Sequence, residues 1–381
     1  MRVPFVDLTG QHAPLRKEID SAIARVVDGG HFVGGREVAS FEEEFAASLD
    51  VPCAVGVASG TDALVLALQS LGVGAGDDVI TTPVSFVAST EAIARVGARP
   101  VFADIDDSDL NLSPEAVVNV LSEYVRGSDG TLRSRDGRRA VAILVVHLFG
   151  APADVESFAA IAKEHGLVLI EDAAQAFGAT VRGKSVGTFG DVGCVSFFPT
   201  KTLGAMGDGG AVVTRDSQVA GRVKQLREHG AVGNEVYDHV GYNSRLDALQ
   251  AAVLRVKLPH AAAWNEERSA IAAQYVERLR NVPGFSFQRT TREGLSRVFH
   301  QFVVRGARSL DAHARLRSAG IETREYYLRP LNEQRALAPL SRTPLPIPCA
   351  ESVCGDLLAL PVFPGLSREM VNYVADALAS L

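Results

Sequence analysis

The sequence lacks the signatures of several common classes of protein. Its four cysteines, Cys53, Cys194, Cys349 and Cys354, form no CxxC pair, and its nine histidines form no HExxH motif. Cys53 and Cys194 lie in apolar runs, where a cysteine usually behaves as a small buried hydrophobe. These patterns disfavour a metal site, and we expect reduced thiols, as in cytosolic proteins.

Long apolar segments and an excess of positive charge are also missing. No stretch reaches the roughly 20 apolar residues that span a bilayer, and the first residues, MRVPFVDLTGQ, show no apolar region of a secretory signal. The formal charge of -7 disfavours a protein whose main role is to neutralise nucleic-acid phosphates. We therefore expect a cytoplasmic protein that binds neither a membrane nor a nucleic acid.

Apolar runs alternate with helix-like segments from about residue 50 to residue 215. This alternation predicts a mostly parallel, seven-stranded sheet with helices on both faces. Ser113 followed by Pro114 is typical of a helix start. The expected strands are 52–57, 78–82, 100–104, 140–148, 167–171, 192–198 and 210–214, and the expected helices are 61–71, 86–96, 113–124 and 154–165.

The pattern changes after about residue 246. Residues 246–280 predict a long helical region that is interrupted at Pro259, and a strand at 298–304 and a helix near 310–319 follow.

We expect two domains, a large one at 1–250 that includes an N-terminal arm and a smaller α+β domain at 251–381. The arginine-rich run 124–139 indicates an exposed loop or a small hairpin, although it could also contact an anionic substrate.

Lysine is scarce, and one of the six lysines has an unusual setting. Lys201 follows the apolar strand 192–198 and leads into TLGAMGDGGA, a glycine-rich loop that lets the backbone approach a ligand closely. Taken alone, Lys201 could simply be a solvated loop cation. The others, Lys17, Lys163, Lys184, Lys224 and Lys257, lie in helix-like or polar stretches.

Asp172 follows another apolar strand, 167–171. Ligands bind beyond the carboxyl ends of the strands in open α/β sheets, so Asp172 and Lys201 are expected at the same edge. A carboxylate there could keep a pyridine nitrogen protonated. Alternatively, Asp172 could cap a following helix.

Residues 58–64, ASGTDAL, lie between a strand and a helix. Free N–H groups at a helix start, together with a glycine and a hydroxyl group, can hold a phosphate, although an ordinary capped turn is the alternative. No GxxxxGK[ST] loop occurs, and the missing GxGxxG motif disfavours a nicotinamide-dependent dehydrogenase.

The order of these three elements, phosphate cradle, strand-end aspartate and post-strand lysine, is that of aspartate-aminotransferase-like (fold type I) enzymes. From near residue 5 to near residue 365 the chain resembles the sugar aminotransferases of the DegT/DnrJ/EryC1/StrS family, which use pyridoxal 5'-phosphate (PLP). The segments that carry the resemblance are VDL at 6–8, ASGTDAL at 58–64, TTPVSFVAST at 81–90, PVFADID at 100–106, VHLFG at 146–150, EDAAQAFGA at 171–179, SFFPTKTLGAMGDGGAVVT at 196–214, GYNSRLDALQAAVL at 241–254 and LPVFPGL at 360–366.

The resemblance implies roles for individual residues. Lys201 matches the lysine that forms the internal aldimine, Asp172 the partner of the pyridine nitrogen, and Gln175 the residue near the ring hydroxyl. Phe86 matches the aromatic residue that stacks on the ring, although an aromatic at that spacing is more often in the core. Gly60, Thr61 and Ser196 match phosphate contacts, Ser85 and His147 are in motif positions on the cofactor side, and Asn243 matches an asparagine from the neighbouring subunit, which implies a homodimer with shared active sites.

The substrate side departs from the family pattern. The family often has a His-Tyr pair and a later histidine where this chain has Tyr326-Tyr327 and Asn332, and the 124–139 loop is longer than in many relatives. The residues that we expect to contact the sugar or diphosphate are Arg245, Arg324, Tyr326, Tyr327 and Arg329.

The resemblance implies amino-group transfer to a nucleotide-linked keto sugar, with L-glutamate as the usual donor and pyridoxamine 5'-phosphate as the intermediate, in deoxyamino sugar biosynthesis for an antibiotic or a glycan. The expected substrate is TDP-4-keto-6-deoxy-D-glucose, aminated at C4; a TDP-3-keto-6-deoxy hexose aminated at C3 or a UDP-linked keto sugar is the alternative. A dehydratase of the same fold is disfavoured, because such relatives typically replace the lysine with histidine. A catalytically idle, dimeric regulatory relative is a further alternative, which retention of Lys201, Asp172 and Gln175 disfavours.

Overall fold

A central sheet organises the chain in the computed structural model, which describes residues 1–233, 235–289, 292–306 and 309–380. All neighbouring strands of its main path are parallel except around β11, which runs antiparallel to both of its neighbours. The expected mostly parallel sheet is therefore confirmed. Two short strands outside the main path, described below, make the sheet nine-stranded, and the main path has the seven expected strands. In sheet order the strands are β1 (Cys53–Val57), β11 (Gly210–Thr214), β10 (Val192–Ser196), β7 (Val168–Asp172), β6 (Arg139–Val146), β2 (Asp77–Thr81) and β3 (Arg99–Phe102).

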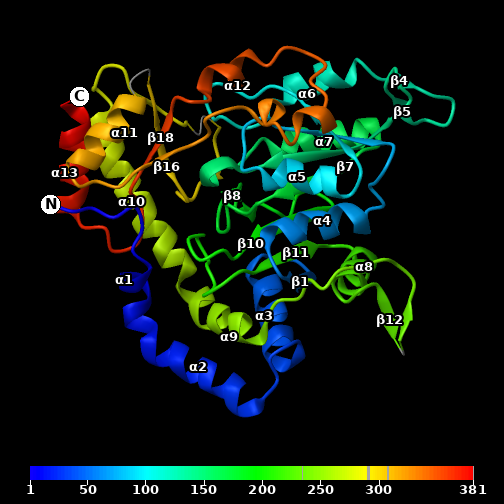
Figure 1. The fold of residues 1–381 in the computed structure, drawn as a ribbon, viewed down its shortest axis with the longest axis horizontal. Helices are drawn as coiled ribbons and strands as arrows, with labels where there is room; N and C mark the ends of the chain where they lie inside the picture. Colours follow the sequence, from blue (N-terminus) through cyan, green and yellow to red (C-terminus); the bar gives the residue numbers. More distant parts are fainter. Residues whose placement is uncertain (234, 290–291, 307–308, 381) are drawn as a thin grey trace.

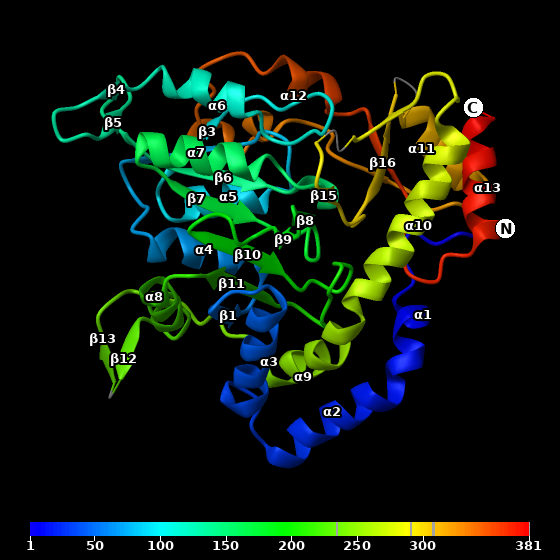
Figure 2. The same ribbon diagram turned by 180° about the vertical axis from the view of Figure 1, so that it is seen from behind.

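Alternate residues of the strands pack into two separate cores, because successive side chains of a strand point to opposite faces. In β6, Ile143 and Val145 belong to one core, whereas Leu144 and Val146 belong to the other. Helices cover both faces (Figures 1 and 2). The first core includes α3 (Gly35–Ser48), α6 (Pro114–Leu121) and α7 (Val155–His165), and the second includes α4 (Gly60–Ser70), α5 (Ala88–Arg95) and α8 (Ser217–Arg227).

The arginine-rich segment forms the expected hairpin, with strands β4 (Val125–Arg126) and β5 (Leu132–Arg133). It extends the central sheet through pairing of β5 with β6. Arg133 forms an ion pair with Asp129 at 2.8 Å, and Arg139 forms one with Asp77 at 2.6 Å. Carboxylates of the chain itself therefore neutralise part of its charge.

A smaller unit lies beside the large sheet and carries an antiparallel sheet of its own. The predicted long helical region is broken by a 3-10 turn at Leu258–His260, which contains Pro259, as expected. The first part of this region, α9 (Ala248–Lys257), still packs against α3 in the core of the large sheet. The elements that follow are α10 (Ala261–Leu279), β14 (Ser286–Phe287), β16 (Phe302–Arg305), α11 (Ser309–Ser318), β17 (Arg324–Glu325), α12 (Pro348–Val353), β18 (Leu357–Leu360) and α13 (Arg368–Ala379).

The chain passes between the two units more than once. Val3 forms a bridge with Ile321 and lies in the core of the smaller unit, whereas α2 (Arg16–Gly29) packs against α9 beside the large sheet. The proposed division at residue 250 stays a prediction. The remaining elements are α1 (Leu8–His12), α2 (Arg16–Gly29), β8 (Thr180–Val181), β9 (Lys184–Ser185), β12 (Ala231–Gly233), β13 (Val236–Tyr237), β15 (Leu295–Ser296) and 3-10 turns at Ala13–Leu15, Leu148–Gly150, Leu331–Glu333 and Ala338–Leu340.

Within the described ranges, no helix is both long enough and apolar enough to cross a membrane.

Candidate active site

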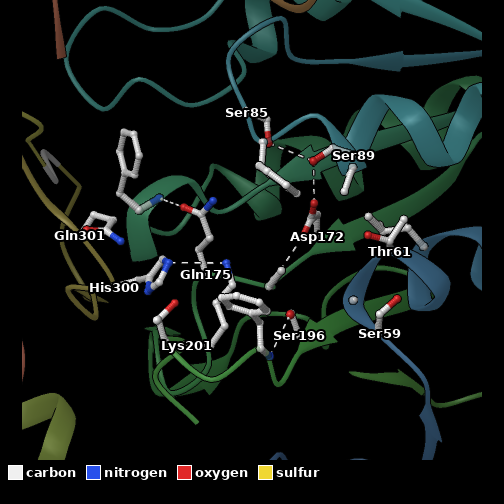
Figure 3. A pocket seen from close by; sticks show the side chains of 18 of the residues that line it. Ser59, Thr61, Ser85, Ser89, Asp172, Gln175, Ser196, Lys201, His300 and Gln301 are labelled. Atoms are coloured by element: carbon white, nitrogen blue, oxygen red, sulfur yellow. Dashed lines mark hydrogen bonds between the residues drawn. The ribbon is translucent and has the colours of Figure 1, made fainter. Parts of the chain in front are cut away.

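A cavity of about 420 Å³ opens at the carboxyl ends of the parallel strands, where ligands bind in open α/β sheets. The ends of β7 and β10 and the start of α4 line it together with residues of the smaller unit (Figure 3). Residues far apart in the sequence therefore form one site. The predicted residues that line it are Gly60, Thr61, Ser85, Phe86, Asp172, Gln175, Ser196, Lys201, Tyr326 and Tyr327.

The start of α4 forms an anion-binding cradle. Ser59 caps this helix by accepting a hydrogen bond from the Asp62 N–H at 3.1 Å. The N–H groups of Gly60 and Thr61 precede the first intrahelical bond and are free to face the cavity. A helix start with free N–H groups favours a phosphate, so this part of the site suits the phosphate of a cofactor.

Gly60 allows β10 to approach the cradle closely, because a Cβ at Gly60 would lie 2.6 Å from Cβ of Ser196. We expect Gly60→Ala to weaken PLP binding about ten- to a hundredfold, since the added methyl group pushes the two phosphate contacts apart. Titration of the cofactor-free protein with PLP measures this loss. Gly221→Ala on α8 is the matched control, because a Cβ there meets nothing within 4 Å, and unchanged affinity in Gly60→Ala would contradict the cradle.

Asp172 ends β7 and points into the cavity (Figure 3). Its carboxylate accepts hydrogen bonds from the Ser89 hydroxyl at 2.7 Å and from the Ala174 N–H at 3.1 Å. Ser85 contacts the Ser89 hydroxyl in turn, at 2.9 Å. Residues 173–179 form turns rather than a helix, so the alternative in which Asp172 caps a helix is wrong.

Lys201 lies at the cavity in a loop that other elements hold in place. The Thr202 hydroxyl donates to the Phe177 carbonyl at 3.3 Å, and the Met206 N–H donates to Gln250 Oε1 at 2.9 Å. The buried ammonium group of Lys257 donates to the Gly204 carbonyl. These three contacts fix the backbone on the C-terminal side of Lys201.

The surroundings of Lys201 increase the fraction of its neutral form. Loss of water around the amine lowers the pKa of Lys201 to about 8, although the nearby Asp172 carboxylate opposes the fall. At pH 7 about a tenth of such lysines carry a neutral, nucleophilic amine, far more than at the ordinary lysine pKa.

Gln175 joins Phe149 and Tyr327, two aromatic residues that line the cavity. Its Oε1 accepts a hydrogen bond from the Phe149 N–H at 2.7 Å, and its Nε2 donates to the Tyr327 hydroxyl at 3.4 Å. The Tyr327 ring stacks on Phe149 with a centroid distance of 5.9 Å. Phe86, in contrast, is 57% exposed beside the cavity, and such an aromatic residue can stack on a planar ring.

Besides His147, which is described below, four predicted residues lie outside the cavity lining. Arg245 pairs with Glu228 at 3.1 Å, and Arg324 donates to the Thr323 carbonyl at 3.1 Å. Arg324 is exposed on the edge strand β17. The side chains of Tyr326 and Tyr327, which follow it in the chain, line the cavity instead. The four are Asn243, Arg245, Arg324 and Arg329, and a role for them at this site remains a prediction.

The sequence reading missed several residues of the lining. His300 and Gln301 are the most informative, because they interrupt the apolar run VFHQFVV and are nevertheless buried. Two adjacent polar residues in the middle of an otherwise apolar run are the sequence signal that could have indicated them. The missed polar residues are Ser59, Ser89, Thr200, Asp208, His300 and Gln301.

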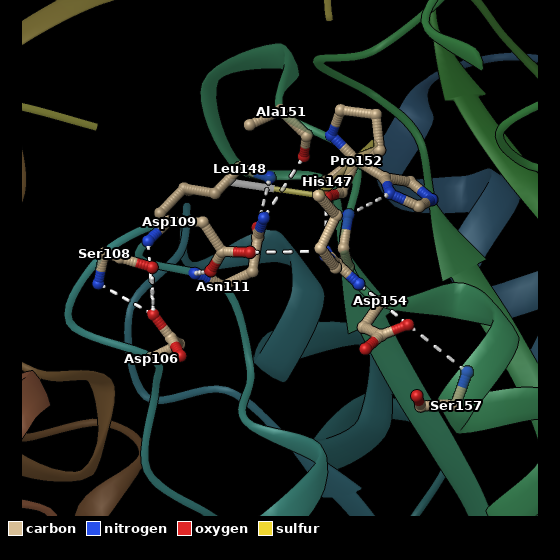
Figure 4. A network of polar contacts seen from close by, with 12 residues as sticks. Asp106, Ser108, Asp109, Asn111, His147, Leu148, Ala151, Pro152, Asp154 and Ser157 are labelled. Atoms are coloured by element: carbon tan, nitrogen blue, oxygen red, sulfur yellow. Dashed lines mark hydrogen bonds and ion pairs between the residues drawn. The ribbon is translucent and has the colours of Figure 1, made fainter. Parts of the chain in front are cut away.

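His147 does not line the cavity, but it hydrogen-bonds to the strand that carries Asp172. Its Nδ1 accepts a hydrogen bond from the Ala153 N–H at 3.1 Å, so Nε2 carries the proton and donates to Glu171 at 3.1 Å. Asn111 holds the same turn by accepting from the Leu148 N–H at 3.0 Å (Figure 4). This network fixes the end of β7, which carries Asp172.

Glu171 is fully buried and accepts hydrogen bonds from the N–H groups of Gly187, Phe189 and Gly190 at 2.6–2.7 Å. Burial alone would raise the pKa of Glu171, but His147 and the N–H donors together lower it below its ordinary value. The carboxylate therefore stabilises the fold above pH 4.5, the ordinary value, and this contribution is lost as the pH falls through the lowered pKa.

We expect Glu171→Gln to lower the free energy of unfolding by about 2–4 kcal/mol at pH 7, because an amide N–H₂ then faces N–H donors. Chemical denaturation measures this difference, which should shrink below pH 4.5 as the wild-type carboxylate is protonated. Glu164→Gln on the exposed part of α7 is the control. A difference that does not depend on pH would contradict this explanation.

The geometry fits PLP. The cradle suits its phosphate, the Asp172 carboxylate its ring nitrogen, the Lys201 amine its aldehyde and Phe86 its ring face. In the part of the chain that the structure describes, no group of three or more His, Cys, Asp or Glu side chains could hold a metal ion. Fold and site together have the features of the PLP-dependent fold type I class of enzymes.

Comparison with known proteins gives the family. Residues 14–379 match the DegT/DnrJ/EryC1/StrS aminotransferase family, and the chain belongs to it. The structure is similar to that of DesV from S. venezuelae in complex with a ketimine intermediate, with a TM-score of 0.92, 40% identity and coverage of 100% of this chain and 98% of that one.

Sequence relatives cover nearly the whole chain. The dTDP-3-amino-3,4,6-trideoxy-alpha-D-glucose transaminase of Streptomyces venezuelae is 41% identical over 99% of this chain and 95% of its own length. The UDP-N-acetyl-3-dehydro-alpha-D-glucosamine 3-aminotransferase of Acidithiobacillus ferrooxidans is 40% identical over 99% and 97%. A "pleiotropic regulatory protein" of Geobacillus stearothermophilus is 41% identical over 100% and 98%. The chain is thus a transaminase whose relatives include aminotransferases of TDP- and UDP-linked sugars.

Proposed function

We propose that this protein transfers the amino group of an amino acid, L-glutamate in the first instance, to C3 of a nucleotide-linked 3-keto sugar, with PLP as cofactor. The observation that carries the chemistry is the meeting of Lys201, Asp172 and the Gly60 cradle in one cavity. The names of two relatives at 40–41% identity favour C3, since both place the nitrogen there. We prefer C3, the alternative in the sequence reading, to C4; amination at C4 remains an untested prediction.

Different residues of the site would hold the cofactor and move the protons. When bound, PLP supplies an electrophilic carbon and a ring that accepts electrons. The cradle holds the phosphate, and the Asp172 carboxylate holds the proton on the ring nitrogen. In the first half of the reaction the Lys201 amine removes a proton from the α-carbon of the donor. In the second half it delivers a proton to C3 of the sugar. Positioned proton transfer of this kind contributes about 10²–10⁴-fold to a rate.

A two-stage assay tests the substrate. The PLP-loaded protein is first treated with L-glutamate, and the visible absorbance and the 2-oxo acid are measured. It is then offered matched 3-keto and 4-keto TDP sugars and a UDP-linked 3-keto sugar. If a 3-keto sugar restores the visible absorbance of the PLP form and yields an aminated product, the proposal is supported. Amination of the 4-keto sugar alone would restore the C4 assignment.

A regulatory function is the second candidate, because one relative at 41% identity is named as a regulatory protein. The lowered pKa of Lys201 and its place beside Asp172 favour an enzyme, since a regulator needs neither. Failure of L-glutamate to change the spectrum would favour the regulatory candidate.

We further propose a homodimer in which Asn243 completes the partner's phosphate site. Asn243 does not reach the cavity of its own chain, although it belongs to a motif of the resemblance. The neighbouring hairpin β12–β13 projects from the body of the chain (Figure 1). Its apolar side chains, Val232, Val236 and Tyr237, are exposed, as expected of a surface that packs against a second copy.

Mixing two inactive variants tests this shared site. Lys201→Ala and Asn243→Ala should each lack activity as pure dimers, but one site of a mixed dimer contains both intact residues. After random exchange of subunits we expect about a quarter of the wild-type activity, because half of the dimers are mixed and each has one good site. No recovery, with mixed dimers verified by two affinity tags, would contradict the contribution of Asn243 in trans.

A further inference from the structure

His300 contacts the side-chain amine of Lys201, to which we assign the proton transfers. It precedes β16 in the smaller unit, and its Nε2 lies 3.5 Å from Nζ of Lys201 (Figure 3). The adjacent Gln301 N–H donates to the Phe149 carbonyl at 3.5 Å. The smaller unit therefore supplies a side chain that reaches the lysine of the large sheet.

The imidazole has little other hydrogen bonding. His300 is 7% exposed, and its Nδ1 has no hydrogen-bond partner among the described residues. A buried polar atom without a partner is unfavourable, so it calls for an explanation other than packing. The contact with Lys201 is the one polar contact of the ring that the described residues provide.

Burial and nearby positive charges keep this imidazole neutral. Burial, Lys201 and the Arg268 guanidinium lower the pKa of His300 well below its ordinary value. Arg268 also donates to the Phe299 carbonyl at 3.4 Å, next to His300 in the chain. The other titratable groups around the cavity are Asp172 from β7, Asp208 from the loop before β11, and Tyr326 and Tyr327 after β17.

A neutral imidazole is suited to one task here. It offers an acceptor nitrogen to an amine without the negative charge that would hold the amine as an ammonium ion. A carboxylate in the same place would stabilise the ammonium form and suppress the nucleophile. The arrangement therefore combines orientation of the amine with a low cost for its deprotonation.

We propose, on the basis of the proposed PLP-dependent function, that His300 is a positioning residue that accepts a hydrogen bond from the Lys201 amine through Nε2 and directs its lone pair into the cavity. The released lysine then stays in line with the substrate carbon between proton removal and proton delivery. Neither proton transfer consumes or changes the imidazole, which remains neutral throughout.

Glutamine and asparagine give a matched pair of substitutions. His300→Gln places an amide oxygen at about the position of Nε2, whereas the amide of His300→Asn is one methylene group shorter and does not reach Lys201. Both are polar and smaller than histidine, so packing changes are similar. His165→Asn at the end of α7 is the control for loss of a histidine elsewhere.

The first measurement uses the cofactor-free protein. Trace acylation with acetic anhydride across a pH series, read by mass spectrometry at each lysine, gives the midpoint at which Lys201 becomes reactive. We expect the midpoint to fall by about one pH unit in His300→Asn, because the ammonium form loses its acceptor, and to stay near the wild-type value in His300→Gln and His165→Asn.

The second measurement uses the PLP-loaded protein. We expect kcat to fall about tenfold or more in His300→Asn with KM for L-glutamate within about twofold, and His300→Gln to recover most of kcat. An acylation midpoint and kcat in His300→Asn that equal the wild-type values would overturn the proposal. If that variant does not fold, His300→Met, which has no acceptor nitrogen, takes its place.

The two proposals fail in different ways. If the wild-type protein does not react with PLP at Lys201, the proposed function fails, whatever the acylation series gives. If PLP reacts normally but His300→Asn and His300→Gln behave alike, the aminotransferase stands and the role of His300 fails.

Discussion

Lys201→Ala will fold and bind PLP through its phosphate, but it will form no covalent adduct and will lose turnover by about 10²–10⁴-fold or more. Lys201 makes one side-chain hydrogen-bond contact within the described residues, with His300, so little stability depends on it. The loss should therefore appear in kcat and in the visible spectrum, while the thermal unfolding midpoint stays near the wild-type value.

Lys224→Ala is the control for this variant, because Lys224 is exposed on α8. The two proteins should have the same unfolding midpoint and differ only at the active site. Wild-type turnover in Lys201→Ala would remove the central assignment, since none of the other lysines lines the cavity.

Asp172→Asn is the second change with a large expected effect. The amide has nearly the same shape but no negative charge, so it cannot hold a proton on the ring nitrogen of PLP. We expect the rate of the first half-reaction with L-glutamate to fall by about 10²–10³-fold, the range for loss of one electrostatic contact to developing charge. Rapid-mixing absorbance under single-turnover conditions measures this rate directly.

Binding of PLP should change much less in this variant, because the phosphate cradle at Gly60 is separate from Asp172. Asp191→Asn is the matched control: its carboxylate accepts a hydrogen bond from the Leu169 N–H at 2.8 Å near the start of β7, away from the cavity. A half-reaction in Asp172→Asn that is as fast as in the control would contradict the role of the carboxylate.

Much of the large unit could be predicted because its strands are continuous apolar runs that end in polar residues. The expected strand 167–171 corresponds to β7 (Val168–Asp172), and 210–214 coincides with β11. Since parallel strands present their carboxyl ends at one edge, Asp172 and Lys201 could be placed together without knowledge of the fold in detail.

Contacts between the two units could not be predicted in this way. His300 reaches Lys201 across 99 positions of the sequence, and no local pattern specifies how the smaller unit docks on the sheet. Val3 similarly joins the smaller unit although it begins the chain. The directions of the side chains in and just after β17 could not be predicted either, because Tyr326 lines the cavity while Arg324 is exposed.

The most direct test of the central claim is to fix PLP to the protein with sodium borohydride and to locate the modified lysine by peptide mass spectrometry. We expect modification of Lys201 alone among the six lysines, and less of it when L-glutamate is added first. Modification of another lysine, or of none, would contradict the assignment of this cavity as the active site of a PLP-dependent aminotransferase.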